Sequence, residues 1–147
     1  MKPEKKLRIL LAEDSALTIY LYQHLLNSLV GDQRGLLQEY IPECSGFDIS
    51  LTTVSARNPK DAFGYLGQDG AHFDAVLSDG TGWFPFAIEA QKRFSVIGCT
   101  GDPEMVLAFK EAGIPCYLKA GSSSSEIKNI EQVCVEVIRT GLGLPGL

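Results

Sequence analysis

Short apolar runs alternate with longer amphipathic segments along this chain of 147 residues. Each run has the length of a buried strand, and the segments between the runs carry apolar residues at helical spacing, as Leu17, Leu21 and Leu25 do. Strands that alternate with helices are typical of a parallel sheet covered by helices on both faces. We therefore predict an α/β fold, a doubly wound three-layer sheet made of five βα units. The expected strands lie at 7–12, 48–54, 73–79, 95–100 and 116–119.

Capping residues and prolines mark where the expected helices begin. The first helix is expected over 15–30, and the last should run to Arg139. Segment 84–94 contains Pro85, which suits only a first helical turn, so the helix there should be short. The expected starts are Ser15, Asn58 with Pro59, Asp102 with Pro103, and Ser123 with Glu126 at the spacing of a capping box.

The length corresponds to one domain of ordinary size, so we expect residues 1–147 to form a single domain. Residues 31–46 have turn residues at both ends, and we interpret them as a connection with one helical turn. Segment 141–147 is a glycine-rich, apolar tail, and no effector domain is expected. The apolar residues of the connection, which either cover the core or form a docking patch, are Leu36, Leu37, Tyr40 and Ile41.

Charge, hydropathy and cysteine usage exclude several classes of protein. The formal net charge of -5 and the sequence pI near 5.0 argue against direct binding of nucleic acid. No apolar stretch is long enough to span a bilayer, and no signal peptide is recognisable, so we expect no membrane insertion. The four cysteines form no CxxC pair, which is consistent with reduced thiols in a reducing compartment. These features predict a cytoplasmic protein.

Polar residues follow four of the expected strands at the point where each strand ends. Right-handed crossovers bring the carboxyl ends of parallel strands to one edge of the sheet, so these side chains should converge. Three carboxylates in one place repel one another unless a cation joins them, and hard oxygen ligands suit Mg²⁺. A hydroxyl and an ammonium beside them suit a phosphoryl group as the remaining partner. The five converging residues are Glu13, Asp14, Asp79, Thr100 and Lys119.

These segments resemble the receiver domain of bacterial two-component response regulators, the CheY-like superfamily, over essentially the whole chain. Residues 10–14 look like the family's apolar strand ending in an acidic pair, and residues 74–79 are similar to its D-[LVI]-[VI]-L-x-D strand. Residues 96–101 stand where the family has its Thr/Ser-Ala step, and residues 113–119 resemble its G-A-x-x-Y-L-x-K segment. The resemblance implies a flavodoxin-like sheet with strand order 2-1-3-4-5.

The resemblance also implies a phosphorelay role for the chain. Asp79 would be the phosphoacceptor and would receive a phosphoryl group from a phosphohistidine of a sensor histidine kinase or a histidine phosphotransfer protein. Thr100 and Lys119 would each pair with a phosphoryl oxygen. Mg²⁺ would be held by Asp14, Asp79, Glu13 through water, and the backbone carbonyl of Thr81.

Phosphorylation would then switch a protein-binding face, by the same resemblance. This face consists of the helix expected after Asp102, the strand at 116–119 and the last helix, and it is also the expected homodimer contact. Tyr117 is the candidate switch residue. The chain would act as a signalling domain and not as an enzyme, and its sequence does not identify the downstream output protein.

Three segments depart from the family pattern. Tyr117 lies two residues before Lys119, whereas the family's switch residue lies three before the lysine, and an offset of one residue reverses the face of a strand. Ala120 replaces the family's proline, so the peptide bond between Lys119 and Ala120 should be trans. Gly82 and Trp83 replace the usual Met-Pro, and the short segment from Asp79 to the next strand predicts a stunted third helix.

Two other functions use the same residues. In a pseudo-receiver the fold would serve as an unphosphorylated protein-interaction module, and the departures from the pattern favour this alternative. Residues 78–81, Ser-Asp-Gly-Thr, also resemble part of the D-x-D-G-T motif of haloacid-dehalogenase-type phosphatases. The nucleophile of such a phosphatase would fall on Leu77, which cannot attack phosphorus.

Asp14 and Ser15 also have a purely structural interpretation. Taken singly, these two residues could be no more than helix caps.

Overall fold

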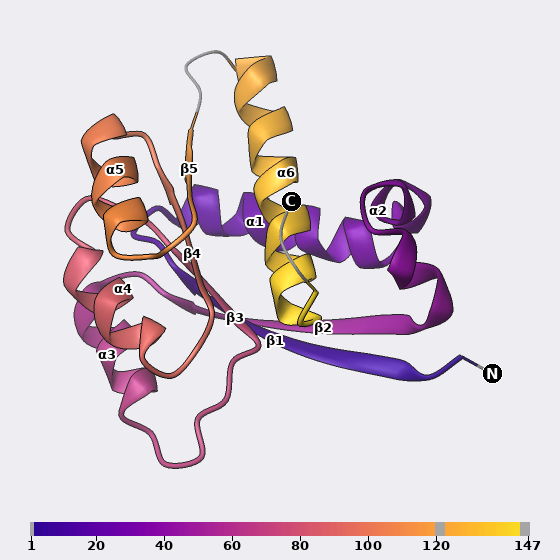
Figure 1. Ribbon diagram of the computed structural model, residues 1–147, viewed down its shortest axis with the longest axis horizontal. Helices are drawn as coiled ribbons and strands as arrows, with labels where there is room; N and C mark the ends of the chain where they lie inside the picture. The colour runs from indigo at the N-terminus through magenta and orange to yellow at the C-terminus, as the bar shows by residue number, and fades with distance from the viewer. Residues whose placement is uncertain (1, 120–122, 145–147) are drawn as a thin grey trace.

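Five parallel strands form one sheet in the order β2-β1-β3-β4-β5 (Figure 1). The computed structural model describes residues 2–119 and 123–144, except for the side chains of 123–129. The α/β class and the strand order expected for a flavodoxin-like sheet are confirmed. The strands are β1 (Glu4–Ala12), β2 (Asp48–Ala56), β3 (Ala75–Ser78), β4 (Val96–Thr100) and β5 (Cys116–Leu118).

The helices begin where the capping residues predict. The Ser15 hydroxyl accepts a hydrogen bond from the backbone N–H of Thr18 at 3.2 Å, and Asn58 and Asp102 cap their helices in the same way. Within the described residues, no helix combines the length and the apolarity needed to cross a bilayer. The helices are α1 (Ala16–Val30), α2 (Arg34–Tyr40), η1 (Pro42–Gly46, 3₁₀), α3 (Pro59–Leu66), α4 (Phe84–Gln91), α5 (Pro103–Glu111) and α6 (Ser123–Gly141).

Two details of the helices concern the sequence predictions. Helix α4 has eight residues, as short as expected, and α6 ends at Gly141, two residues beyond the predicted end. The side chains of the expected capping box at Ser123 and Glu126 lie outside the described residues.

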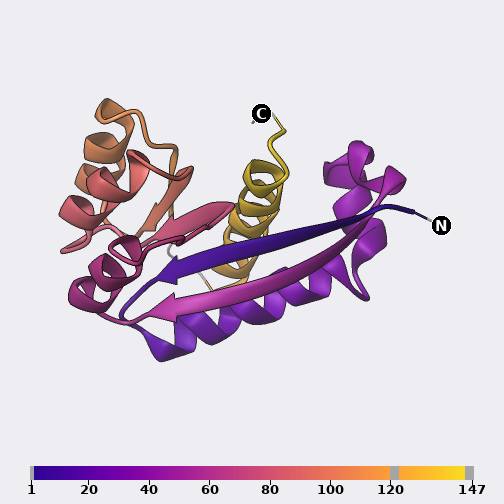
Figure 2. The same cartoon turned by 90° about the horizontal axis from the view of Figure 1, so that it is seen from below.

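Helices cover both faces of the sheet (Figures 1 and 2). On one face α1 and α6 pack on inward-facing residues such as Ile9 and Leu11 of β1. On the other face α3, α4 and α5 pack on Leu10 and its neighbours. Alternate residues of β1 therefore enter different halves of the core, as the pleat of a strand requires. Both halves of the core are apolar. The polar residues that follow the strands lie outside them, at the carboxyl edge of the sheet.

The segment 31–46 contains more structure than the single helical turn that its sequence predicts. Helix α2 and η1 occupy it, and the Arg34 guanidinium joins their ends by donating hydrogen bonds to the backbone carbonyls of Cys44 and Phe47. Leu37 and Ile41 are fully buried in the same half of the core as α1 and α6. This arrangement favours the interpretation that these apolar residues cover the core.

A conservative change tests this interpretation. Ile41→Val should cost about 1 kcal/mol of the free energy of unfolding, because it deletes a methylene from a fully buried site and leaves a void. The measurement is a urea titration followed by circular dichroism. Leu107→Ala removes more carbon from a side chain that is 62% exposed and should cost less than about 0.5 kcal/mol. Equal costs for the two variants would contradict a covering role.

Candidate functional site

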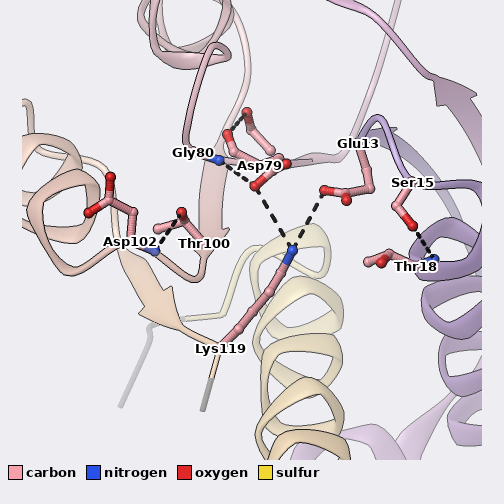
Figure 3. A network of polar contacts seen from close by, with 9 residues as sticks. Glu13, Ser15, Thr18, Asp79, Gly80, Thr100, Asp102 and Lys119 are labelled. Atoms are coloured by element: carbon pink, nitrogen blue, oxygen red, sulfur yellow. Dashed lines mark hydrogen bonds and ion pairs between the residues drawn. The ribbon is translucent and has the colours of Figure 1, made fainter. Parts of the chain in front are cut away.

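The carboxyl ends of the strands meet at one edge of the sheet, and the predicted polar residues lie there (Figure 3). Backbone hydrogen bonds fix the first two loops: the N–H of Asp79 donates to the carbonyl of Ala12 at 2.8 Å, and the N–H of Glu13 donates to the carbonyl of Ala56 at 3.1 Å. Each acidic loop is thus anchored to the strand beside it. The sheet topology itself therefore brings the carboxylates together.

Glu13, Asp14 and Asp79 form an acidic cluster. Each offers one carboxylate oxygen, and these three oxygens lie within 4.8 Å of one another. Glu13 is buried, Asp14 is exposed and Asp79 is half-buried, so the cluster opens to solvent on the Asp14 side. Such an arrangement gives a small ligand access to one side of the cluster.

The ammonium of Lys119 lies between two of these carboxylates. Its Nζ is 3.7 Å from Oε2 of Glu13 and 3.9 Å from Oδ1 of Asp79, and Figure 3 shows the side chain extending between them. The N–H of Lys119 donates to the carbonyl of Thr100 at 2.8 Å, which extends the pairing of β5 with β4. At these distances the ammonium forms ion pairs that leave its hydrogen-bonding capacity available.

Burial and charge raise the pKa of the Glu13 carboxyl from 4.5 to about 7. Burial is the largest cause, and the neighbouring Asp79 and Asp14 carboxylates add to it, whereas Lys119 acts in the opposite direction. Glu13 is only 3% exposed, and its Oε2 accepts no hydrogen bond from any residue in the described part of the chain. A buried carboxylate oxygen without a donor is costly, and a cation would satisfy it.

The residues present fit a hard divalent cation. Three carboxylates supply oxygen ligands, one of them has a buried oxygen to which no described residue donates, and the exposed side leaves room for water ligands. Mg²⁺ prefers oxygen ligands and keeps several waters, so one or two direct carboxylates suffice for it. The backbone carbonyl of Thr81 belongs to the loop that follows Asp79, and the Thr81 side chain is exposed.

Thr100 ends β4 beside the loop that carries Asp79. Its side chain is 2% exposed, and its Oγ1 accepts a hydrogen bond from the N–H of Asp102 at 3.2 Å. A hydroxyl that accepts one bond still has its proton to donate. The structure thus brings Glu13, Asp14, Asp79, Thr100 and Lys119 to one edge, as their positions after the strands predict.

Tyr117 lies within β5, two residues before Lys119. It packs against the half of the core that contains α1 and α6, whereas Cys116 belongs to the other half. Burial raises the pKa of the Tyr117 phenol, with Glu136 of α6 as a second cause. Tyr117 and Cys116 therefore face opposite sides of the sheet, as consecutive residues of a regular strand do. The peptide at Ala120, expected to be trans, lies outside the described residues.

Two residues of the site were not found by sequence reasoning. The N–H of Gly80 donates to Oδ1 of Asp79 at 2.7 Å, and so orients the carboxylate. Arg57, after β2, donates from Nε to the backbone carbonyl of Asp14 at 3.3 Å. A glycine directly after a strand-end aspartate was a usable signal for the first. Nothing in the sequence marks Arg57, because its contact depends on the pairing of β1 with β2.

No family model and no curated protein sequence matches the chain, but solved structures share its fold. The phosphorylated cyanobacterial phytochrome response regulator RcpA has a TM-score of 0.65 at 18% identity, over 92% of this chain and 96% of that one. A response regulator receiver protein from Burkholderia phymatum has a TM-score of 0.60 at 16% identity, over 99% and 98%. The BeF₃-activated DrrB receiver domain has a TM-score of 0.55 at 16% identity, over 95% and 99%. The chain therefore has the fold of response regulator receiver domains.

Proposed function

We propose that this chain is a phosphoacceptor receiver of a two-component phosphorelay, with Asp79 as the residue that becomes phosphorylated. One observation carries the proposal: three carboxylates, a lysine ammonium and a buried threonine meet at the carboxyl edge of a receiver fold. An open α/β sheet binds its ligand at this edge. A protein that served only as a scaffold would gain nothing from holding like charges together.

Asp14, Asp79, Glu13 through water, and the Thr81 carbonyl would hold Mg²⁺ in this receiver. When bound, the ion would neutralise negative charge on the transferring phosphoryl group. The exposed Asp14 and the half-buried Asp79 can reach an ion directly, and the buried Glu13 lies deeper in the cluster. The protein's own contribution is to keep these oxygens together before an ion arrives.

The transfer step uses Asp79 as a nucleophile. A carboxylate oxygen forms a bond to phosphorus as the phosphorus–nitrogen bond of a phosphohistidine breaks, and the bonding electrons leave with the imidazole. The product is an acyl phosphate on Asp79. Lys119, already within ion-pair distance of Asp79, pairs with one phosphoryl oxygen, and the Thr100 hydroxyl donates its proton to another.

The partners and the output follow from the same proposal. The phosphodonor is a sensor histidine kinase or a histidine phosphotransfer protein, and the chain is a signalling domain that another protein reads. The face formed by α5, β5 and α6 is the surface that phosphorylation switches, and it is also the homodimer contact. Tyr117, which packs toward α6, is the switch candidate on this face.

One alternative retains specific support. Tyr117 lies on the face of the sheet opposite to Cys116, the residue in the family's usual switch position, and this favours a pseudo-receiver that binds partners without phosphorylation. The phosphatase alternative has no such support. Its nucleophile would be Leu77, which is 1% exposed and packs in the core.

A mass measurement separates these functions. Incubation of the chain with Mg²⁺ and acetyl phosphate should add one phosphoryl group in the intact mass, and EDTA should prevent it. The absence of any gain, even with a phosphohistidine donor, would leave the interaction module as the function. Turnover of a phosphate ester such as p-nitrophenyl phosphate would instead support the phosphatase.

A further inference from the structure

The backbone of Gly80 lies directly against the side chain of Thr100. A β-carbon placed on Gly80 would be 2.5 Å from both Cβ and Oγ1 of Thr100 and 3.1 Å from its Cγ2. Contacts of 2.5 Å do not occur between such atoms in folded proteins, so any larger residue at position 80 would have to displace something. The backbone of Gly80 does not adopt the left-handed conformation, unlike that of Gly82 with φ of 81°. Glycine is therefore required at position 80 because a larger residue does not fit, and not because the backbone there needs a conformation that only glycine adopts.

Neither side of this contact can withdraw easily. The N–H of Asp79 donates a hydrogen bond to the carbonyl of Ala12, and the N–H of Trp83 donates to the carbonyl of Gly80 at 3.0 Å. The loop that contains Gly80 is therefore fixed at both ends. On the other side, the Thr100 carbonyl accepts from Lys119, the residue whose ammonium faces Asp79. Rotation of the Thr100 side chain would move Oγ1 and Cγ2 away at the loss of one hydrogen bond, but it leaves Cβ in place, so the loop or the end of β4 must also shift.

We propose that Gly80 is a positioning residue: the absence of its side chain allows the Thr100 hydroxyl to lie over the loop that carries Asp79, where it can donate to a phosphoryl oxygen. This inference rests on the proposed phosphoacceptor function. The Asp102 N–H completes the arrangement, since it binds the Thr100 oxygen as an acceptor and leaves the hydroxyl proton for donation. Thr100 is thus held beside Asp79 before any phosphoryl group arrives.

Gly80→Ala tests the proposal, and Gly101→Ala is its matched control. Among the described residues, a β-carbon on Gly101 would meet no atom within 4 Å, and Gly101 has no positive φ, although it directly follows Thr100 at the end of β4. With acetyl phosphate and Mg²⁺, Gly80→Ala should be phosphorylated more slowly by roughly tenfold to 100-fold, because misplaced groups cost rate on that order. Gly101→Ala should stay within about twofold of wild type.

Two further readouts distinguish positioning of Thr100 from damage to the acidic cluster. The midpoint of a Mg²⁺ titration, followed by the fluorescence of Trp83, the only tryptophan, should be nearly the same in Gly80→Ala and wild type. The double variant Gly80→Ala/Thr100→Gly should be no slower than Thr100→Gly alone, since Thr100→Gly removes the hydroxyl together with every atom that the new β-carbon would meet. Full additivity of the two costs, or loss of Mg²⁺ binding, would overturn the proposal. So would wild-type rates in Gly80→Ala.

The position of Thr100 can also be measured without any phosphoryl transfer. In metal-free protein, the NMR resonance of the Thr100 γ-methyl group should move in Gly80→Ala and stay in place in Gly101→Ala. An unmoved resonance would overturn the inference, whereas a wild-type chain that takes up no phosphoryl group would overturn the proposed function alone. Should Gly80→Ala fail to fold, Thr100→Gly in the same chain removes the atoms in conflict and should restore folding; continued misfolding would count against the proposal.

Discussion

Asp79→Asn should take up no phosphoryl group from acetyl phosphate under conditions in which the wild-type chain is fully modified. The amide has the size of the carboxylate, and its oxygen can still accept the hydrogen bond from the Gly80 N–H. The variant therefore keeps the shape of the loop and loses only the nucleophilic charge. Intact mass spectrometry after incubation with Mg²⁺ and acetyl phosphate measures the outcome.

A surface change of the same kind provides the control for Asp79→Asn. Asp69→Asn alters the same chemical group on an exposed residue, and it should leave phosphorylation unchanged. Asp79→Asn should also fold at least as well as wild type, because it removes one charge that raises the pKa of Glu13. A phosphoryl group that still appears on Asp79→Asn would assign the nucleophile elsewhere, and the exposed Asp14 would then be the first carboxylate to test.

The sequence predicts this site well for a physical reason. A polar residue directly after a buried parallel strand has to lie at the carboxyl edge, and the topology rules leave few ways to order the strands. Asp79, Thr100 and Lys119 are therefore expected at one edge of the sheet from their positions in the sequence alone. The alternation of faces along a strand likewise predicts that Tyr117 points away from the face of Cys116.

The remaining features depend on distances between segments that are remote in sequence. Helix α2 and η1 have little apolar periodicity of their own, and they are stabilised by packing on α1 and by the bond from Arg139 of α6 to the Tyr40 carbonyl. The contact of Gly80 with Thr100 depends on how closely the loop after β3 approaches the end of β4. Neither the structure of α2 and η1 nor the contact of Gly80 with Thr100 can be predicted from the neighbouring residues in the sequence alone.

The second large effect concerns Glu13 and the stability of the metal-free protein. Because burial raises its pKa from 4.5 to about 7, the folded chain binds more protons than the unfolded chain between these pH values. The free energy of unfolding in EDTA should therefore fall as the pH rises through this window and level off above about pH 7. At about 1.4 kcal/mol per pKa unit, the full loss amounts to about 3 kcal/mol.

Glu13→Gln should abolish most of this pH dependence, because a neutral amide never presents a buried charge to Asp79 and Asp14. In EDTA the variant should be more stable than wild type by about 3 kcal/mol at pH 8 and nearly equal to it at pH 5, as measured by urea titrations at the two pH values. Glu111→Gln, on an exposed residue, should leave the wild-type pH profile in place. Mg²⁺ should reduce this difference at pH 8, since it stabilises the folded form that binds it and wild type binds it more tightly. If the free energies of unfolding of wild type and Glu13→Gln instead had parallel pH profiles in EDTA, Glu13 would not be the group whose burial opposes folding. The acidic cluster would then not need a cation to be stable.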